Sequence, residues 1–311
     1  MSADNLWPDA KKFAFTIFDD TDNATVANVG PVYSFLADCG FRTTKSVWVV
    51  DGNPHRGNCV GDSCAKPDYL RWVKNLQSRG FEIGFHNCSW HGLPRDEIRA
   101  ALDRFVDLFG NNPQSAANHT GVEESIYWAD ARLSGWRRWV YNLLTRFHNY
   151  KRFTGHVEGN EYFWGDFCKE RIKYLRNFTY HEINTLKACP FMPYHDPQRP
   201  FVNYWFASSD GHDLPTFNEC LSEENQDRLE EEGGACIMYT HFAKKFCEDG
   251  KLNPRFRELM LRLSKKNGWF VPTATLLDYL LKVNGHHAIS NAERRGLEMK
   301  WLGEKIFTGT T

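Results

Sequence analysis

Short apolar segments alternate with longer amphipathic segments along most of this 311-residue chain. The apolar segment Phe13 to Phe18 has the length of a strand, and the segment Val29 to Cys39 that follows has the spacing of a helix. Apolar residues recur at helical spacing again from Arg95 to Phe109, where Gly110 is placed to cap the helix. Since strands that are joined through helices run parallel, this rhythm predicts an α/β fold with a mainly parallel sheet, open or closed into a barrel.

The pattern gives strands and helices in alternation over most of the chain. Strands are expected at residues 13–18, 46–50, 81–85, 114–117, 175–178, 235–240 and 269–271, and helices at 29–39, 68–78, 95–109, 222–232, 254–265, 273–283 and 291–306. Residues 185–217 have no clear periodicity, so we expect a long ordered loop there, and loops of that length tend to be functional. Neither a linker nor a repeat is visible, which predicts a single domain over residues 1–311 with a C-terminal helical extension at about 285–311. This amphipathic helix could pack on the barrel, dimerise or contact a membrane surface, and packing on the barrel is the default expectation.

The charge balance excludes one class of partner. The formal net charge is −1, which argues against a protein that binds nucleic acid through its phosphates. No run of about 18 apolar residues occurs, so no membrane-spanning helix is expected. The N-terminus has neither the basic nor the apolar region of a signal peptide, so we expect a cytoplasmic location.

Three of the expected strands end in side chains that can ligate a metal or transfer a proton. Asp19 and Asp20 end the first, His86 and His91 follow the third, and His241 ends the strand at residues 235–240. Because the carboxyl ends of parallel strands meet at one edge, these residues should lie together. An Asp-His-His set binds a divalent metal and leaves a coordination position open for water. The sequence therefore predicts the metal site of an enzyme.

The same segments resemble three motifs of the polysaccharide deacetylase family, also called the NodB-homology or carbohydrate esterase 4 family. Phe18–Thr21 is similar to the family's aspartate-pair motif, and Glu82–His86 followed by His91 is similar to its two-histidine metal motif. Gly233–His241 resembles its last motif, an apolar strand that ends in a histidine. The resemblance runs in the family's order from about residue 12 to 281, and it implies a distorted (β/α) barrel of the NodB-homology type.

The resemblance also implies a role for each motif residue. Asp19 would be the general base, Asp20, His86 and His91 would hold the metal, and His241 would be the general acid. A carboxylate that is bound to a cation is held ionised and is a poor base, so one member of the adjacent pair must stay free. A histidine opposite can donate a proton near neutral pH.

Two positions in these motifs have alternatives. Asp22 could replace Asp20 as the ligand, because an Asp-x-Asp sequence also presents two carboxylates to one centre. Cys88 could ligate zinc, but thiolate ligation gives a closed site less suited to hydrolysis, so we expect it to pack in the core. The spacing of His86 and His91 is i, i+5 where the family has i, i+4, and a loop after a strand can accommodate the extra residue.

The third motif of the family contains an arginine that this chain lacks. The motif would fall at Pro113–Gly121, where Ala117 stands in the place of the arginine. The base Asp19 must then be oriented by another group, for which Asn118, His119 or an arginine from a later segment are candidates.

The region from Tyr162 to Phe206 does not match the fourth motif, and we interpret it as an elaboration for a particular substrate. Asp166 or Arg199 could tune the catalytic pair. Tryptophans near the site motifs, Trp48, Trp90, Trp164 and Trp205, could form a wall that stacks on a sugar ring. The candidate substrate-binding residues are Trp90, Asn118, His119, Asp166, Arg199 and Trp205.

These inferences predict a metal-dependent hydrolase that removes an N-acetyl group from an amino sugar or carbohydrate precursor. Zinc is the expected metal from the type of ligand, although Co²⁺, Ni²⁺ and Fe²⁺ also suit an Asp-His-His site. The alternatives are a deformylase or another C–N amide hydrolase on the same site, or a non-catalytic carbohydrate-binding descendant of the fold. A separate base and acid argue against the binding protein, which needs neither.

Overall fold

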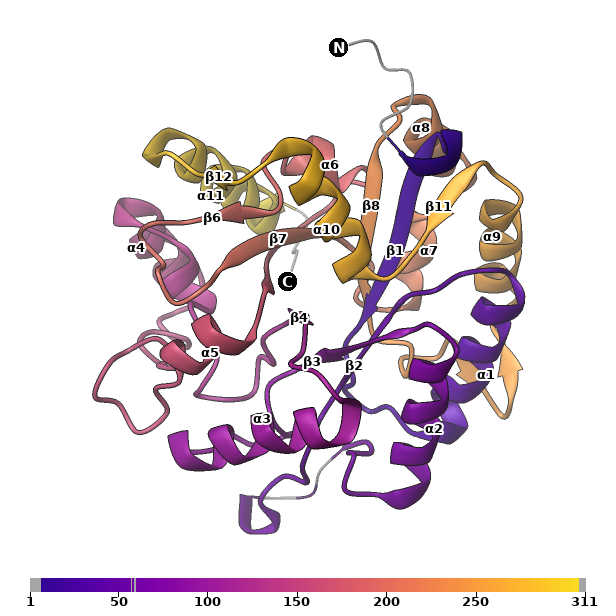
Figure 1. Cartoon of the computed structure of the whole chain (residues 1–311). Helices are drawn as coiled ribbons and strands as arrows, with labels where there is room; N and C mark the ends of the chain where they lie inside the picture. Colours follow the sequence, from indigo (N-terminus) through magenta and orange to yellow (C-terminus); the bar gives the residue numbers. More distant parts are fainter. Residues whose placement is uncertain (1–6, 57, 59, 308–311) are drawn as a thin grey trace.

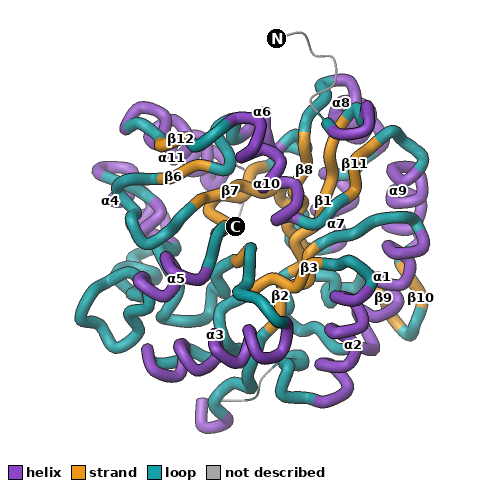
Figure 2. The backbone as a smooth tube through the Cα atoms, viewed as in Figure 1, coloured by secondary structure: helices purple, strands orange, loops and turns teal. Residues whose placement is uncertain are grey.

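Seven parallel strands close into a barrel in the computed structural model, which describes residues 7–56, 58 and 60–307 (Figures 1 and 2). In order around the barrel they are β1 (Phe13–Asp19), β2 (Thr44–Val47), β3 (Glu82–Phe85), β4 (Ser115–Ala116), β5 (Tyr174–Tyr180), β7 (Tyr204–Asp210) and β8 (Ala235–Thr240). β8 pairs with both β7 and β1, and this closes the ring. The predicted single-domain (β/α) barrel is confirmed.

The barrel is distorted because one side of β1 is shared by two strands. β2 pairs with the end of β1 at Phe18 and Asp19, whereas β11 (Gly268–Phe270) pairs with its beginning at Phe13–Phe15. Outside the barrel, β6 (Tyr194–His195) pairs antiparallel with β7, and β12 (His287–Ala288) pairs with β6. A small ribbon of β9 (Cys247–Glu248) and β10 (Lys251–Leu252) stands apart.

Helices surround the barrel (Figure 2). They are α1 (Val26–Asp38), α2 (Pro67–Ser78), α3 (Arg95–Phe109), α4 (Gly135–Leu144), α5 (Gly165–Arg171), α6 (Thr185–Ala188), α7 (Leu214–Cys220), α8 (Glu223–Glu231), α9 (Pro254–Ser264), α10 (Thr273–Asn284) and α11 (Asn291–Phe307), with 3₁₀ turns at η1 (Pro8–Ala10), η2 (Pro54–Arg56) and η3 (Ala129–Arg132). α3 shows why the apolar spacing predicted a helix there. Ile98, Leu102 and Phe105 are buried on one face, and Gly110 caps the end of the helix with a φ of 86°. None of the described helices is long and apolar enough to cross a bilayer.

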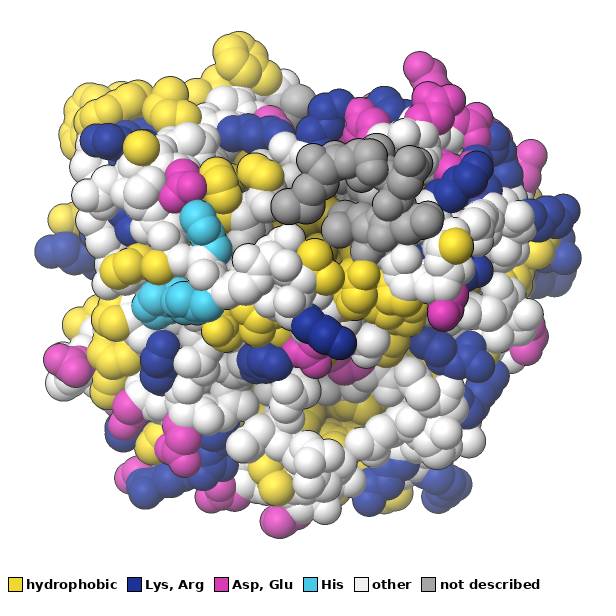
Figure 3. All heavy atoms as spheres, turned by 45° about the horizontal axis from the view of Figure 1, so that its top comes forward, with side chains coloured by type: hydrophobic (Ala, Val, Ile, Leu, Met, Phe, Trp, Pro, Cys, Tyr) yellow, Lys and Arg dark blue, Asp and Glu magenta, His cyan; other side chains and the backbone are white. Residues whose placement is uncertain are grey.

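The core lies inside the barrel and between the barrel and the helices. All seven residues of β1 are buried, because both faces of a parallel barrel strand are covered. On the face shown in Figure 3, Lys and Arg side chains are interspersed with Asp and Glu side chains, as expected for a formal net charge of −1.

The predicted long loop at residues 185–217 was wrong. It contains α6, β6, the barrel strand β7 and the start of α7. The second half of β7 is polar and buried. Ser209 is fully buried, and its hydroxyl donates to the Ile183 carbonyl and pairs with the Thr185 hydroxyl at 2.7 Å. A hydrophobic pattern cannot reveal a strand of this kind.

The C-terminal helix α11 packs on the barrel beside α4. Its Trp301 ring lies 5.6 Å from the Phe178 ring of β5 and 5.7 Å from the Tyr141 ring of α4. The buried Glu298 carboxylate accepts hydrogen bonds from Arg137 and Ser134. These contacts bring α11 to the mouth of the barrel, where Trp301 and Lys305 line a cavity.

Candidate active site

A cavity of about 210 Å³ lies where the strands end. Asp20 and Asp22 reach it from the loop after β1, His86 from the end of β3, His119 from the segment after β4, and His241 from the end of β8. This is the edge at which the carboxyl ends of parallel strands meet, so the shared location follows from the topology.

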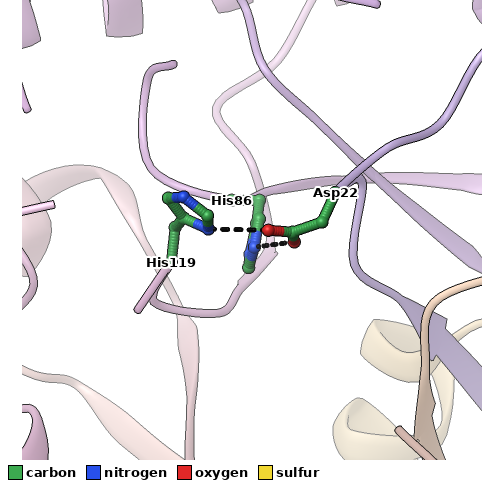
Figure 4. A group of neighbouring side chains, drawn as sticks. All are labelled: Asp22, His86 and His119. Atoms are coloured by element: carbon green, nitrogen blue, oxygen red, sulfur yellow. Dashed lines mark hydrogen bonds and ion pairs between the residues drawn. The ribbon is translucent and has the colours of Figure 1, made fainter. Parts of the chain in front are cut away.

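Two clusters in the cavity could hold a metal ion: Asp22 with His86 and His119 (Figure 4), and Asp22 with Asp20 and His241. The first contains two histidines. The Asp22 Oδ2 atom lies 3.0 Å from His86 Nε2, and its Oδ1 atom lies 3.0 Å from His119 Nδ1. One ligand atom from each residue falls within 4.8 Å of the others. A carboxylate and two imidazoles that converge from three strand ends are a donor set that suits a divalent transition metal.

The surroundings of His86 fit that use. Its Nδ1 atom lies 3.2 Å from the Ala117 carbonyl, so both ring nitrogens face acceptors. An imidazolium satisfies both, and so does a neutral imidazole whose Nε2 lone pair binds a cation while Nδ1–H donates to the carbonyl. Burial lowers the pKa of His86, but the nearby Asp20 and Asp22 carboxylates outweigh burial and hold it above its usual value.

Asp20 is held by an arginine. Arg176 of β5 donates from Nη1 to Asp20 Oδ1 at 2.9 Å and from Nη2 to Oδ2 at 2.5 Å, with both side chains buried. Burial raises the pKa of Asp20, but Arg176, followed by His86, brings it below its usual value. Arg176 thus comes from a later segment, as expected for the substitute arginine, but it pairs with Asp20 rather than Asp19.

His241 presents one ring nitrogen to the cavity. Its Nδ1 atom lies 2.7 Å from the His212 carbonyl, so Nδ1 carries a proton and donates it in that hydrogen bond. Its Nε2 atom lies 3.5 Å from Asp22 Oδ2. His241 is therefore oriented so that only Nε2 can exchange a proton with a molecule in the cavity.

Asp19, predicted to be the base, lies outside the cavity. It is fully buried, with its Oδ2 atom 3.0 Å from Lys45 Nζ and 2.9 Å from the Tyr33 hydroxyl, while Oδ1 accepts from the Phe242 backbone N–H. Successive strand residues point to opposite faces, so Asp19 points to the helix layer when Asp20 points to the cavity. The carboxylates at the site are Asp20 and Asp22, the residues of the Asp-x-Asp alternative.

His91, predicted to be a metal ligand, also lies outside the cluster, and His119 lies in its place. A tight turn holds His91 away: the Ser89 hydroxyl accepts from the His91 N–H at 3.2 Å and donates to the His91 carbonyl at 2.6 Å. His119 is fixed by its backbone N–H, which donates to Asn87 Oδ1, and by the Trp90 ring at 5.2 Å. We predicted His119 only as a substrate-binding residue.

The remaining predicted residues have mixed positions. Asn118 lines the cavity, but its side-chain amide bonds to both backbone groups of Ile126 and so holds a loop. Four residues do not line the cavity. Trp90 packs on His119, Asp166 pairs with Arg95 at 2.6 Å, Arg199 donates to the Arg132 carbonyl at 2.5 Å, and Trp205 is buried beside Tyr127. Asp166 and Arg199, which were predicted to tune the catalytic pair, therefore do not reach the cavity.

Several residues that line the cavity were missed by sequence reasoning. They are Trp128 and Arg132 near η3, Tyr141 of α4, Arg176 and Thr179 of β5, Tyr239 of β8, and Trp301 and Lys305 of α11. Of these, only Arg176 falls under a prediction, that of an arginine from a later segment, and it lies in a strand that also contains Asn177 and Thr179. The others depend on how α4, η3 and α11 dock, which no local pattern predicts.

Comparisons with known proteins identify the fold. No family model and no curated protein matches the sequence. A crystal structure described as a candidate polysaccharide deacetylase from Mycobacterium smegmatis matches with a TM-score of 0.50 and 12% identity, over 93% of this chain and 98% of that one. PuuE allantoinase matches with a TM-score of 0.49 and 14% identity, over 89% of this chain and 92% of that one. A protein described as a probable polysaccharide deacetylase from Pseudomonas aeruginosa PAO1 matches with a TM-score of 0.49 and 12% identity, over 89% of this chain and 93% of that one. The chain has the polysaccharide deacetylase fold, as the motifs implied.

Proposed function

We propose that this chain, with its polysaccharide deacetylase fold, is a metal-dependent hydrolase that removes an N-acetyl group from an amino sugar or carbohydrate precursor. The observation that carries the proposal is the convergence of the Asp22, His86 and His119 cluster with Asp20 and His241 in one cavity. A metal ligand set, a second carboxylate and an oriented histidine are the parts that amide hydrolysis needs.

Asp22, His86 and His119 would hold the metal. When bound, a divalent metal polarises an acyl carbonyl and lowers the pKa of water. Zinc is the metal that the ligand types favour, with Co²⁺, Ni²⁺ and Fe²⁺ as alternatives. The Ala117 carbonyl fixes the ring of His86 so that Nε2 faces the site.

Asp20 takes the role of the base that the resemblance gave to Asp19. Arg176 keeps its carboxylate ionised and fixes its orientation through two hydrogen bonds. Each carboxylate oxygen retains a second lone pair, so Asp20 can still accept the proton of the attacking water.

His241, which lies beside Asp20 and Asp22, acts as the acid. Its Nε2 atom donates a proton to the leaving nitrogen, while the bond from Nδ1–H to the His212 carbonyl keeps the ring from turning.

Metal content provides the first test. We expect about one equivalent in the purified wild type and in His91→Ala, and almost none in His119→Ala. His91→Ala is a matched control, because it removes a histidine of the same region that lies outside the cluster. Retention of the metal by His119→Ala together with its loss from His91→Ala would contradict the assignment.

Turnover provides the second test. N-acetylated and N-formylated amino sugars would be supplied to the metal-loaded protein, and released acetate and formate measured. Asp20→Asn should keep the metal and lower kcat about a hundredfold to ten-thousandfold, the usual contribution of a positioned acid or base. Release of formate alone would favour a deformylase, and sugar binding without turnover would favour the binding protein.

A further inference from the structure

The side chain of Arg132 lines the cavity without an acidic partner. Arg132 is 2% exposed, and no carboxylate among the described residues forms an ion pair with it. Its buried Nε atom also has no hydrogen-bond partner. A buried cation that lacks an anion is costly, and such groups are normally paired.

The protein holds Arg132 firmly in this position. The guanidinium carbon lies 3.4 Å from the centre of the Trp128 ring and 5.2 Å from that of Trp301. Behind it, Arg199 donates to the Arg132 backbone carbonyl at 2.5 Å and pairs with the buried Glu298. Aromatic faces attract the cation but accept none of its hydrogen bonds, so its N–H groups remain available to a molecule in the cavity.

A second cation lines the same cavity. Lys305 of α11 lies in the wall beside Arg132 and Trp301. Burial lowers the pKa of Arg132 to about 9, and burial followed by Arg132 lowers the pKa of Lys305. The cavity therefore has acidic and histidine groups at the strand ends and a cationic wall formed by η3 and α11.

We propose that Arg132 and Lys305 bind an anionic substituent, a carboxylate or phosphate group, of the substrate whose N-acyl group is removed. The inference rests on the proposed function and narrows its substrate class to acidic N-acylated sugars, either sugar phosphates or sugar acids. Arginine suits this role because its planar fork matches two oxygens of either anion.

Calorimetric binding tests the subsite without requiring turnover. The probes are N-acetylglucosamine, its 1- and 6-phosphates and N-acetylglucosaminuronate, titrated into metal-loaded wild type, Arg132→Gln, Lys305→Gln and the control Lys300→Gln. Lys300 is an exposed basic residue of α11 that does not line the cavity. We expect an anionic probe to bind the wild type and Lys300→Gln about tenfold or more tighter than the neutral sugar, with the preference lost in Arg132→Gln and reduced in Lys305→Gln.

The outcomes separate this inference from the proposed function. The preference for phosphate or for carboxylate probes identifies the anion. Equal binding of neutral and anionic probes by the wild type, or an unchanged preference in both Arg132→Gln and Lys305→Gln, would overturn the subsite. Anion binding that depends on Arg132 without release of an acyl group would overturn the hydrolase and retain the subsite. If Arg132→Gln does not fold, the anion preference of Lys305→Gln still tests the subsite.

The outer face of α4 carries a second inference that is independent of the cavity. Trp136, Trp139 and Leu143 are 58%, 60% and 54% exposed, whereas the polar Arg137 and Asn142 are buried. A surface helix ordinarily turns its apolar side inward, whereas α4 buries these two polar residues beside Tyr141 and exposes most of its apolar side chains. The exposed Leu144 at the end of α4, and Phe147 and Tyr150 after it, extend this apolar surface.

The charge around this face indicates what covers it. The segment from Gly135 to Val157 contains five Lys and Arg residues and no Asp or Glu. Arg137 pairs with the buried Glu298 and Arg138 pairs with Asp130, which leaves three cations without an acidic partner among the described residues, Arg146, Lys151 and Arg152. Exposed Trp, Leu and Phe side chains beside cations are the composition of surfaces that lie in the headgroup region of anionic bilayers. We infer that the α4 face binds an anionic membrane surface.

Vesicle co-sedimentation tests the membrane inference. The wild type should sediment with vesicles of phosphatidylcholine mixed with phosphatidylglycerol at low salt, and much less with phosphatidylcholine alone or at high salt. Trp136→Ser/Trp139→Ser should bind about tenfold more weakly. The control Val283→Ser, at a residue of α10 that is 48% exposed, should bind as the wild type. Failure of the wild type to bind anionic vesicles, or a dimer in sedimentation velocity that the double variant dissolves, would overturn the inference.

Discussion

Asp19 and Asp20 are adjacent in sequence but belong to different parts of the molecule. Asp19 pairs with Lys45 between β1 and the helices, and Asp20 pairs with Arg176 at the cavity. Both pairs are buried, so removing one partner leaves an uncompensated charge. The difference between the two residues is therefore one of access to the cavity and not of charge.

Substitution of the two aspartates should affect different properties, stability for Asp19 and turnover for Asp20. Asp19→Asn leaves Lys45 without its anion, so we expect it to lower the free energy of unfolding by about 3–5 kcal/mol, while the folded fraction keeps its metal and its kcat. Asp20→Asn should instead lose turnover. Urea denaturation and kcat per folded molecule check this. Loss of kcat in folded Asp19→Asn would restore Asp19 as the base.

Arg176 should matter through Asp20. Arg176→Ala leaves the Asp20 carboxylate without its bidentate partner, so we expect a raised pKa for Asp20 and a shift of the acidic limb of the kcat/KM profile to higher pH. Arg176→Lys should shift the acidic limb less than Arg176→Ala does, because lysine keeps the positive charge beside Asp20 but cannot donate two parallel hydrogen bonds to its carboxylate. A profile unchanged in Arg176→Ala would argue against Asp20 as the base.

At the scale of the elements, α11 does more than cover the barrel. Trp301 packs against β5 and α4 and also lines the cavity together with Lys305. The predicted helix at residues 291–306 agrees with α11, but its role in the site follows only from its docking. Amphipathic spacing tells which face of a helix is buried and says nothing about which partner buries it.

Trp301→Ala should therefore affect stability and binding together. Trp301 is 1% exposed, and removal of a buried tryptophan typically costs about 3–5 kcal/mol. Affinity for an anionic sugar should also fall, because Trp301 faces the Arg132 guanidinium. Phe307→Ala, at the 86% exposed end of the same helix, should change neither property. Thermal unfolding and calorimetry measure the two effects.

At the scale of the whole molecule, stability should depend on pH through Glu124. This residue is fully buried, and no side chain among the described residues forms a hydrogen bond or an ion pair with its carboxylate. Burial, with Glu123 nearby, raises the pKa of Glu124 from 4.5 to about 8. Between these two values the unfolded chain ionises and the folded one does not, so stability falls as pH rises through this window.

Glu124→Gln should remove this part of the pH dependence. The variant should resemble the wild type near pH 4.5 and be more stable above pH 8, by up to about 5 kcal/mol since each pKa unit corresponds to about 1.4 kcal/mol. Urea denaturation across the pH range measures the difference. A constant difference between the two proteins at all pH values would contradict the raised pKa.

The sequence by itself determined the architecture and the edge that carries the site. The periods of helices and strands and the polar residues at strand ends depend on near neighbours in the chain, so they can be read locally. β8 was predicted as Ala235–Thr240 and α3 as Arg95–Phe109, and both have those bounds. The hydrophobic pattern did not predict β7, whose second half is polar.

Only the tertiary structure decided which residues meet in the cavity. The direction of the side chains at the end of β1 places Asp20 and Asp22, but not Asp19, in the cavity. The turn at Ser89 holds His91 outside the cluster, and the segment after β4 places His119 in it. Arg176 and Arg132 face the cavity because β5 and η3 pack where they do. These choices rest on contacts between segments far apart in sequence, whose energies no local pattern contains.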